Sequence, residues 1–167
     1  MKREGQYDIL VRSLAGTSGL TVRPAQDGDL LSSGSAYVVP PDRHVSITES
    51  GRIELGDGAP LNRNRPSADW LFDSLATEIG PAAVVVVLSG SLDDGAIGAV
   101  KVKMMGGRVI AQDPATSRFP SMPVAAIATG CVDFILPAER IASALITLAM
   151  VPGSLELFSV PRRVLYG

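Results

Sequence analysis

The chain has 167 residues, a formal net charge of −2, and a composition that is 46% hydrophobic but only 5% aromatic. A chain of this length can bury roughly 70% of the surface that its unfolded form exposes, so it can build one sizeable core. The single cysteine and single histidine exclude an internal disulfide and a zinc site built from several histidines or cysteines. We therefore expect an aliphatic α/β protein.

The sequence also argues against nucleic-acid and membrane partners. It contains no run of lysines and arginines interleaved with aromatic residues, which is the usual electrostatic footprint of nucleic-acid binding. The first ten residues, MKREGQYDIL, lack the apolar core of a signal peptide, and no apolar run reaches the roughly 18 residues of a membrane span. We therefore expect a cytoplasmic protein without membrane insertion, and we expect no metal or other cofactor.

The first third of the chain predicts a helix followed by short strands. Apolar residues recur at helical spacing over residues 7–15, and glycines follow as stop signals. Residues 20–25 and 36–39 are typical of short strands. Residues 45–48 and 52–55 alternate apolar and polar side chains around a Glu-Ser-Gly turn, which predicts a hairpin with one solvated face.

The remainder alternates helices and strands. A proline and a serine at positions 66 and 67 begin a helix that runs to about residue 79. The predicted elements that follow are a buried strand at 84–88, a helix to about 104, a strand at 108–112, a short helix to 128, a strand at 132–136 and a helix from 137 to about 150. This alternation predicts a doubly wound, mostly parallel sheet in a three-layer α/β/α arrangement with a hairpin. We expect one domain over residues 1–150 and a tail or edge strand over residues 151–167.

The stretch AVVVVLSGSLDDGAIG, residues 83–98, is a strand, a turn and a helix. In open α/β sheets ligands bind outside the carboxyl ends of the strands, where this turn lies. The turn carries Ser91, Leu92, Asp93 and Asp94. Its acids would repel phosphate, and the lysine of a phosphate-binding loop is absent. Spacing leaves two interpretations open: Ser91 and Asp94 cap the helix as a capping box, or the acids have a catalytic or binding role.

Two other polar features are candidates for the same cleft. His44, in the segment PPDRH, is the one histidine, although a lone histidine in a turn is more often a hydrogen-bonded side chain than a catalytic base. Arg63 and Arg65, in NRNRPS, stand beside a predicted helix start and could hold a carboxylate or phosphate, or could simply form a solvated basic loop.

The combination of these motifs resembles a known family. The segments AYVVPPDRHV, NRNRPSADWLF, LSGSLDDGAIG and AQDPATSRFPSMP occur in unbroken order between residues 10 and 148 and resemble the catalytic domain of the CheB chemotaxis protein-glutamate methylesterases. The resemblance implies a doubly wound serine hydrolase that removes methyl esters from glutamates of chemoreceptors with a Ser-His-Asp triad. By this resemblance Asp94 is the triad acid, and the expected partner is a methylated chemoreceptor or a related signalling protein.

The chain departs from the family pattern in two places. Leu92 stands where family members have glycine, and Ser91 stands where many have methionine. The family's Gly-Ala-Ser-x-Gly-Gly nucleophile turn and its catalytic histidine precede the first segment of resemblance and are not found in these 167 residues. We therefore predict an N-terminally truncated domain that is inactive by itself. His44 with Ser89 or Ser91 would need an unrelated geometry to rebuild a triad.

Three functional hypotheses remain open. The first is a methylesterase domain whose front lies upstream. The second is a non-catalytic receptor-binding or regulatory protein of the same fold. The third is an unrelated metal- or sugar-binding domain that uses Asp93 and Asp94. Because the family's first strand is expected to be central in the sheet, we also predict that the gap is closed by self-association or by docking of residues 154–160.

Overall fold

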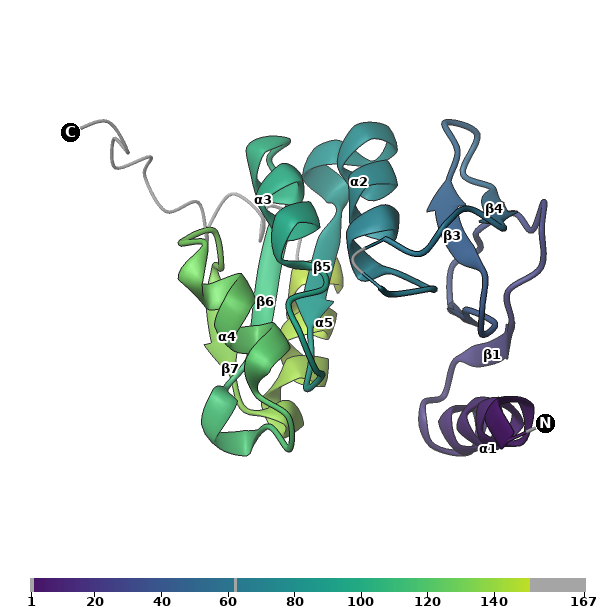
Figure 1. Cartoon of the computed structure of the whole chain (residues 1–167), viewed down its shortest axis with the longest axis horizontal. Coiled ribbons are helices and arrows are strands. Elements are labelled where there is room, and N and C mark those ends of the chain that lie inside the picture. The colour runs from purple at the N-terminus through teal and green to yellow at the C-terminus, as the bar shows by residue number, and fades with distance from the viewer. Residues whose placement is uncertain (1, 62, 151–167) are drawn as a thin grey trace.

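Helices and strands follow one another in the predicted order along residues 2–61 and 63–150, which are the residues that the computed structural model describes (Figure 1). Two single turns of 3₁₀-helix, Gly80–Ala82 and Pro114–Thr116, lie among them. The α-helices and strands are α1 (Lys2–Thr17), β1 (Thr21–Pro24), β2 (Ser35–Val38), β3 (His44–Ile47), β4 (Ile53–Gly56), α2 (Ala68–Glu78), β5 (Val84–Val87), α3 (Ala96–Met104), β6 (Arg108–Gln112), α4 (Ser121–Ala128), β7 (Phe134–Leu136) and α5 (Ala138–Met150).

Strands β5, β6 and β7 form a parallel sheet in the order β5-β6-β7. Alternate residues of these strands face opposite sides. Val85, Val87 and Val109 join the core with α2, α3 and α4, whereas Ile110 packs with Ile141 and Leu148 of α5. Helices therefore cover both faces, which explains the uninterrupted valine run of β5 and confirms the predicted three-layer α/β/α class.

Helix α2 joins this sheet to the first third of the chain. Strands β1 and β2 pair in parallel, and β3 and β4 pair as the predicted antiparallel hairpin. Val45, Ile47 and Ile53 form a second core that includes Leu71 and Leu75 of α2, and both leucines also pack against the core of the parallel sheet. Figure 1 shows α2 between β5 and the hairpin.

The strands do not form one continuous sheet. Within residues 2–61 and 63–150 they form three sheets, β1-β2, β3-β4 and β5-β6-β7, and β5 pairs with β6 alone. The first helix also differs from prediction, because it begins at Lys2 and leaves Ile9 and Leu10 exposed by 67% and 48%. Helical spacing of apolar residues predicts a helix, but whether those apolar residues are buried depends on what packs against the helix. Residues 151–167, the predicted tail, lie outside the described residues.

Among the described residues, no helix is both long enough and apolar enough to cross a membrane. The same residues contain no group of three or more histidine, cysteine, aspartate or glutamate side chains placed to hold a metal ion.

Candidate functional site

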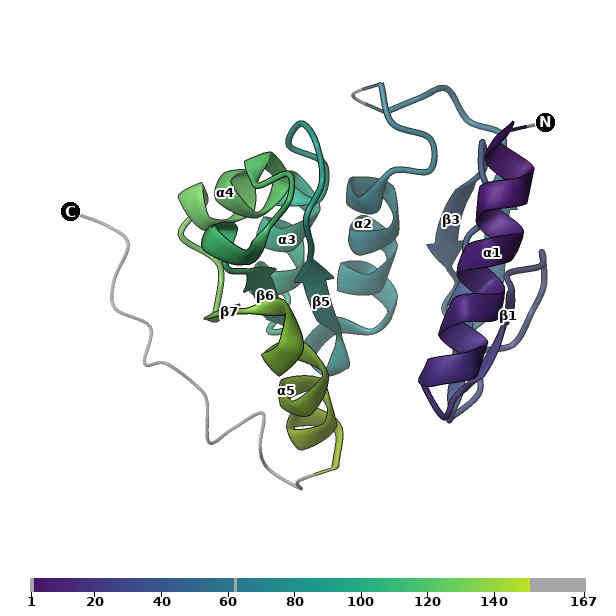
Figure 2. The ribbon, with the colours of Figure 1, turned by 90° about the horizontal axis from the view of Figure 1, so that it is seen from below.

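The candidate site lies where the N-termini of α2 and α3 meet, at the carboxyl end of β5 (Figure 2). The loop from Leu88 to Gly95 connects β5 to α3 and contains Asp94, which is buried with 7% of its surface exposed. Ser67, at the N-cap position of α2, is also buried. The strand-turn-helix predicted from the sequence therefore places its second acid inside the protein, against another helix.

The Asp94 carboxylate caps α2. One of its oxygens accepts hydrogen bonds from the Ser67 hydroxyl at 2.7 Å and from the Asp69 N–H at 3.1 Å, and the other accepts one from the Ala68 N–H at 2.8 Å. These N–H groups belong to the first turn of α2, where intrahelical acceptors are missing and the helix dipole favours negative charge. Ser67 occupies the N-cap position, but its side chain makes no cap bond. Asp94, 27 residues away in the sequence, supplies the cap instead.

Asp69 makes the reciprocal contact. Its carboxylate accepts a hydrogen bond from the Gly98 N–H, at 2.7 Å, in the first turn of α3. Burial raises the pKa of Asp69, hydrogen bonds from the Gly98 and Gly95 backbone oppose this rise, and the negative charge of Asp94 adds to it. An acid in the loop before α3 thus accepts hydrogen bonds from the first turn of α2, and an acid in the first turn of α2 accepts one from the first turn of α3.

Close approach of the two helices depends on Gly98. A Cβ atom built on this glycine would lie 2.5 Å from the Cβ of Phe72 and 3.1 Å from the Cα of Asp69. These separations are shorter than van der Waals contact, and one of them involves backbone that cannot move independently. The glycine therefore permits the short bond between its own N–H and Asp69.

Of the two interpretations that the spacing leaves open for Ser91 and Asp94, the capping box of α3 is not formed. The N-cap of α3 is Gly95, with φ 89°, and no side chain caps it. Ser91, Leu92 and Asp93 are all exposed, so the structure separates the two adjacent acids: Asp93 faces solvent and Asp94 faces α2. Capping motifs read from spacing assume a local helix, whereas Asp94 caps a helix that lies beside its own.

Leu92 has a left-handed backbone with φ 70°. A non-glycine residue held in this region costs about 1–2 kcal/mol of local strain. Glycine adopts the same conformation freely, which gives a physical reason for the glycine that stands here in the family pattern. The Leu92 side chain is 47% exposed, so packing offsets only part of that cost.

Hydrogen bonds fix this loop to the segment before α4. The Gly90 N–H donates to the Phe119 carbonyl at 2.8 Å, and the Phe119 N–H donates to the Ser89 hydroxyl at 2.9 Å. The Ser89 N–H donates to the buried side chain of Gln112, at the end of β6. Gly90 packs closely here, because an added Cβ would lie 2.1 Å from the sulfur of Met122 and would force that side chain to move.

His44 does not join Asp94. Its side chain is completely buried, stacks on Trp70 at a ring distance of 4.5 Å, and contacts the Ala59 carbonyl through Nε2 at 3.1 Å. This geometry supports the hydrogen-bonded structural role over the catalytic one. Ser89 also bonds elsewhere, to Phe119, so the described residues do not assemble a nucleophile and base around Asp94.

Arg63 and Arg65 lie in the loop before α2. Arg63 is exposed and has φ 69°, and Arg65 donates to the Gly58 carbonyl at 3.2 Å. Arg65 therefore braces the loop that enters α2. The structure shows no carboxylate held by either arginine among the described residues.

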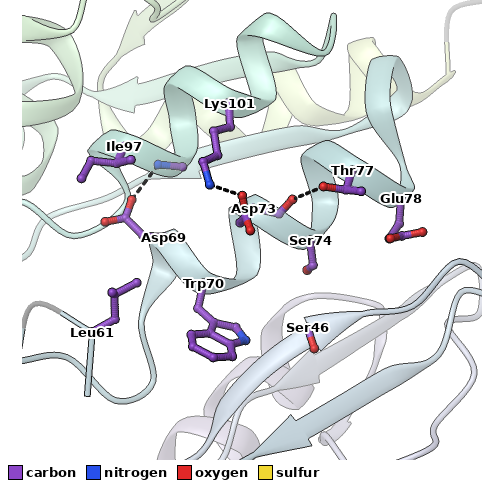
Figure 3. Close-up of a pocket in the computed structure, with 11 residues that line it drawn as sticks. Ser46, Leu61, Asp69, Trp70, Asp73, Ser74, Thr77, Glu78, Ile97 and Lys101 are labelled. Atoms are coloured by element: carbon purple, nitrogen blue, oxygen red, sulfur yellow. Dashed lines mark hydrogen bonds and ion pairs between the residues drawn. The ribbon is translucent and has the colours of Figure 1, made fainter. Parts of the chain in front are cut away.

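A groove of about 580 Å³ runs along the outer face of α2, between α3 and the hairpin (Figure 3). Trp70, Ile97 and Leu61 supply its apolar surface. Asp69 forms the end nearest the candidate site, and Asp73 is paired with Lys101 farther along the helix. The Asp69 oxygen that bonds to Gly98 thus lies on the border between this groove and the cross-capped helix ends.

The sequence pattern does not point to Ser67 and Asp69 as members of the site. Ser67 was predicted only as part of a helix start, and nothing in the spacing signalled Asp69. A general clue was available, because an acid in the first turn of a helix is a common partner of backbone N–H groups. The N–H group that Asp69 bonds to, however, depends on how α2 packs against α3, and the sequence pattern does not show this packing.

A comparison with family models matches residues 2–145 to the CheB methylesterase family. Among curated proteins, the chain is 38% identical over 145 residues to a "Protein-glutamate methylesterase/protein-glutamine glutaminase of group 3 operon" of Rhizobium meliloti, covering 87% of this chain and 41% of the relative. It is 41% identical to a similarly named protein of Burkholderia thailandensis, covering 85% of this chain and 41% of that relative.

The fold has a solved counterpart. The crystal structure of the Thermotoga maritima CheB methylesterase catalytic domain matches with a TM-score of 0.82 and 36% identity, over 86% of this chain and 78% of that one. The chain thus spans about two fifths of the two curated relatives described above, at 41% of each, and most of the solved catalytic domain.

Proposed function

We propose that this chain, which belongs to the CheB methylesterase family, forms the part of a protein-glutamate methylesterase domain that supplies the triad acid, Asp94. The proposed substrate is a glutamyl methyl ester on a chemoreceptor, and the proposed setting is chemotaxis signalling in the cytoplasm. The reaction is hydrolysis of that ester to glutamate and methanol.

The observation that carries this proposal is the fixed, buried carboxylate of Asp94 at the carboxyl end of β5. A triad acid must hold one orientation, because its role is to orient an imidazole and stabilise the imidazolium that forms. Three donors from the described residues hold Asp94. An ionised carboxylate has about four acceptor positions, which leaves one for a histidine N–H.

We further propose that the 167-residue chain does not hydrolyse esters by itself. A serine nucleophile needs a base within hydrogen-bond reach, and the one histidine of the sequence is buried against Trp70. Loss of the serine or histidine of such a triad typically lowers turnover about a million-fold. Asp94 alone has no base to orient.

The test is release of labelled methanol from a chemoreceptor fragment whose glutamates carry radiolabelled methyl esters. We expect the chain to release no more methanol than buffer. A second protein joins to its N-terminus a family segment that carries the nucleophile turn and the histidine. We expect this extended protein to be active and its Asp94→Asn variant to be about 10⁴-fold slower, the loss typical of a triad acid.

Two results would contradict the proposal. Methanol release by the unextended chain would refute its inactivity. An extended protein that is active but indifferent to Asp94→Asn would remove Asp94 from the triad. Translating the DNA upstream in the same frame gives an independent check, because a Gly-Ala-Ser-x-Gly-Gly turn followed by a histidine would supply both missing groups.

The buried position of His44 also favours a second candidate function. His44, the one histidine of the sequence, is buried away from Asp94, and a domain of this fold without a usable base would act as a non-catalytic receptor-binding or regulatory protein. A stop codon upstream, combined with receptor binding but no methanol release, would favour this alternative. We keep self-association through the outer edge of β5 as a further proposal, because this edge pairs with none of the described strands. A single monomeric species in light scattering would refute it.

A further inference from the structure

We propose that Leu92, Phe119 and Arg118 form a contact surface for the polypeptide that carries the methyl ester, and we call these three residues the loop surface. This inference rests on the proposed function, because it concerns the substrate of the same site. The triad acts on the ester group alone. The loop surface would recognise the part of the substrate polypeptide around that group.

Position is the first argument. Leu92 is two residues from Asp94, in the loop at the carboxyl end of β5. Phe119 is brought beside this loop by the paired hydrogen bonds that its backbone makes with Ser89 and Gly90. Figure 2 shows the two segments side by side next to the start of α4. The loop surface therefore borders the candidate site.

Exposure and rigidity are the second argument. Leu92 is 47% exposed and Phe119 is 51% exposed, although both are large apolar side chains. Hydrogen bonds from Ser89 to Gln112 and from Ser121 to Gly90 fix the backbone at the base of the loop that carries Leu92 and next to the segment that carries Phe119. A rigid, exposed apolar contact loses little conformational entropy when a partner binds.

Backbone strain at Leu92 is the third argument. Its φ of 70° is a conformation that glycine would adopt without cost, and its side chain gains little burial in return. Strained residues persist at sites where the surrounding structure holds them for a purpose. Here the strain places an apolar side chain at the border of the site, which a glycine would leave bare.

Charge completes the description of the partner. The Arg118 guanidinium lies 5.4 Å from the centre of the Phe119 ring, so the loop surface combines an aromatic ring with a cation. Each cycle of the proposed reaction produces a glutamate carboxylate on the substrate chain. The partner that fits is thus a polypeptide that presents apolar side chains beside glutamates, with an acidic side chain reaching Arg118.

The experiment measures binding of the full chain to a purified chemoreceptor cytoplasmic fragment that has been methylated at its glutamates. Leu92→Gly and Phe119→Ala are each expected to weaken binding by about 5- to 30-fold, the range typical of an interface contact residue. Arg118→Glu should weaken binding and reduce its dependence on salt. Met104→Ala is the matched control, because Met104 is 75% exposed at the other end of α3.

Thermal unfolding of the same variants separates recognition from folding. Leu92→Gly removes backbone strain, so its melting temperature should equal or exceed that of the wild type while its binding weakens. If the wild type binds and Leu92→Gly and Phe119→Ala bind equally well, the loop surface is refuted while the proposed function stands. If the wild type itself does not bind the methylated fragment, the proposed receptor partner fails and the loop surface fails with it.

Discussion

Replacing Asp94 by alanine should destabilise the protein even though the residue is proposed for catalysis. The substitution leaves the Ser67 hydroxyl and the N–H groups of Ala68 and Asp69 without their acceptor. Loss of one helix cap costs about 0.5–2 kcal/mol, and a buried donor without a partner costs about 1–3 kcal/mol. Because some of these donors can recover a bond to water, we expect a total loss of about 2–4 kcal/mol.

Urea unfolding followed by the fluorescence of Trp70 measures this loss directly, since Trp70 is the one tryptophan and lies in α2. Asp94→Asn keeps one acceptor oxygen but loses the charge that suits the helix dipole, so we expect about 1–2 kcal/mol. Asp93→Asn is the control: this neighbour is exposed, so its effect should stay within about 0.5 kcal/mol. An Asp94→Ala variant as stable as Asp93→Asn would refute the capping role.

Three further predictions follow from the same geometry. Burial raises the pKa of Asp69, so the ionised form opposes folding, and the contribution of this group to stability falls as pH rises from its unfolded pKa of about 3.8 through its folded pKa. In urea unfolding between about pH 3.5 and 7, the free energy of unfolding of Asp69→Asn should therefore rise relative to that of the wild type as pH rises. A difference that stays constant with pH would contradict this. Gly98→Ala should cost about 1–3 kcal/mol by forcing α3 away from Phe72, whereas Gly16→Ala, with open space around it, should be neutral or stabilising in the same measurement. His44→Ala should cost about 2–4 kcal/mol in thermal unfolding, because it empties a fully buried site, and a loss below 1 kcal/mol would show that the ring packing is dispensable.

Local patterns in the sequence were sufficient to predict the elements of this fold. The valine run of β5 and the helical spacing after it gave the strand and helix within a few residues, and the β6 prediction matches Arg108–Gln112 at both ends. Turn signals also placed the β3-β4 hairpin. These features depend on side-chain period and on turn chemistry, which are properties of short segments.

The pairing of elements could not be predicted in the same way. Alternation of strands and helices predicts a parallel sheet, but it does not say which strand edges meet, and among the described residues the β1-β2 pair and the β5-β6-β7 sheet remain separate. The same limit applies at the site. Asp94 was identified through motif resemblance, yet its contacts come from Ser67 and Asp69, 27 and 25 residues away, and are fixed only by the crossing of α2 and α3.

Asp94 both caps α2 and is the proposed triad acid, so substitutions at this residue change stability as well as activity. In a triad the acid must be immobile, and here the Ser67 hydroxyl and two N–H groups at the N-terminus of α2 hold the Asp94 carboxylate. A variant that removes the charge therefore weakens the packing of α2 against α3 as well as the proposed contact to a histidine. Rate comparisons for Asp94 are therefore meaningful only at a temperature where unfolding shows each variant fully folded.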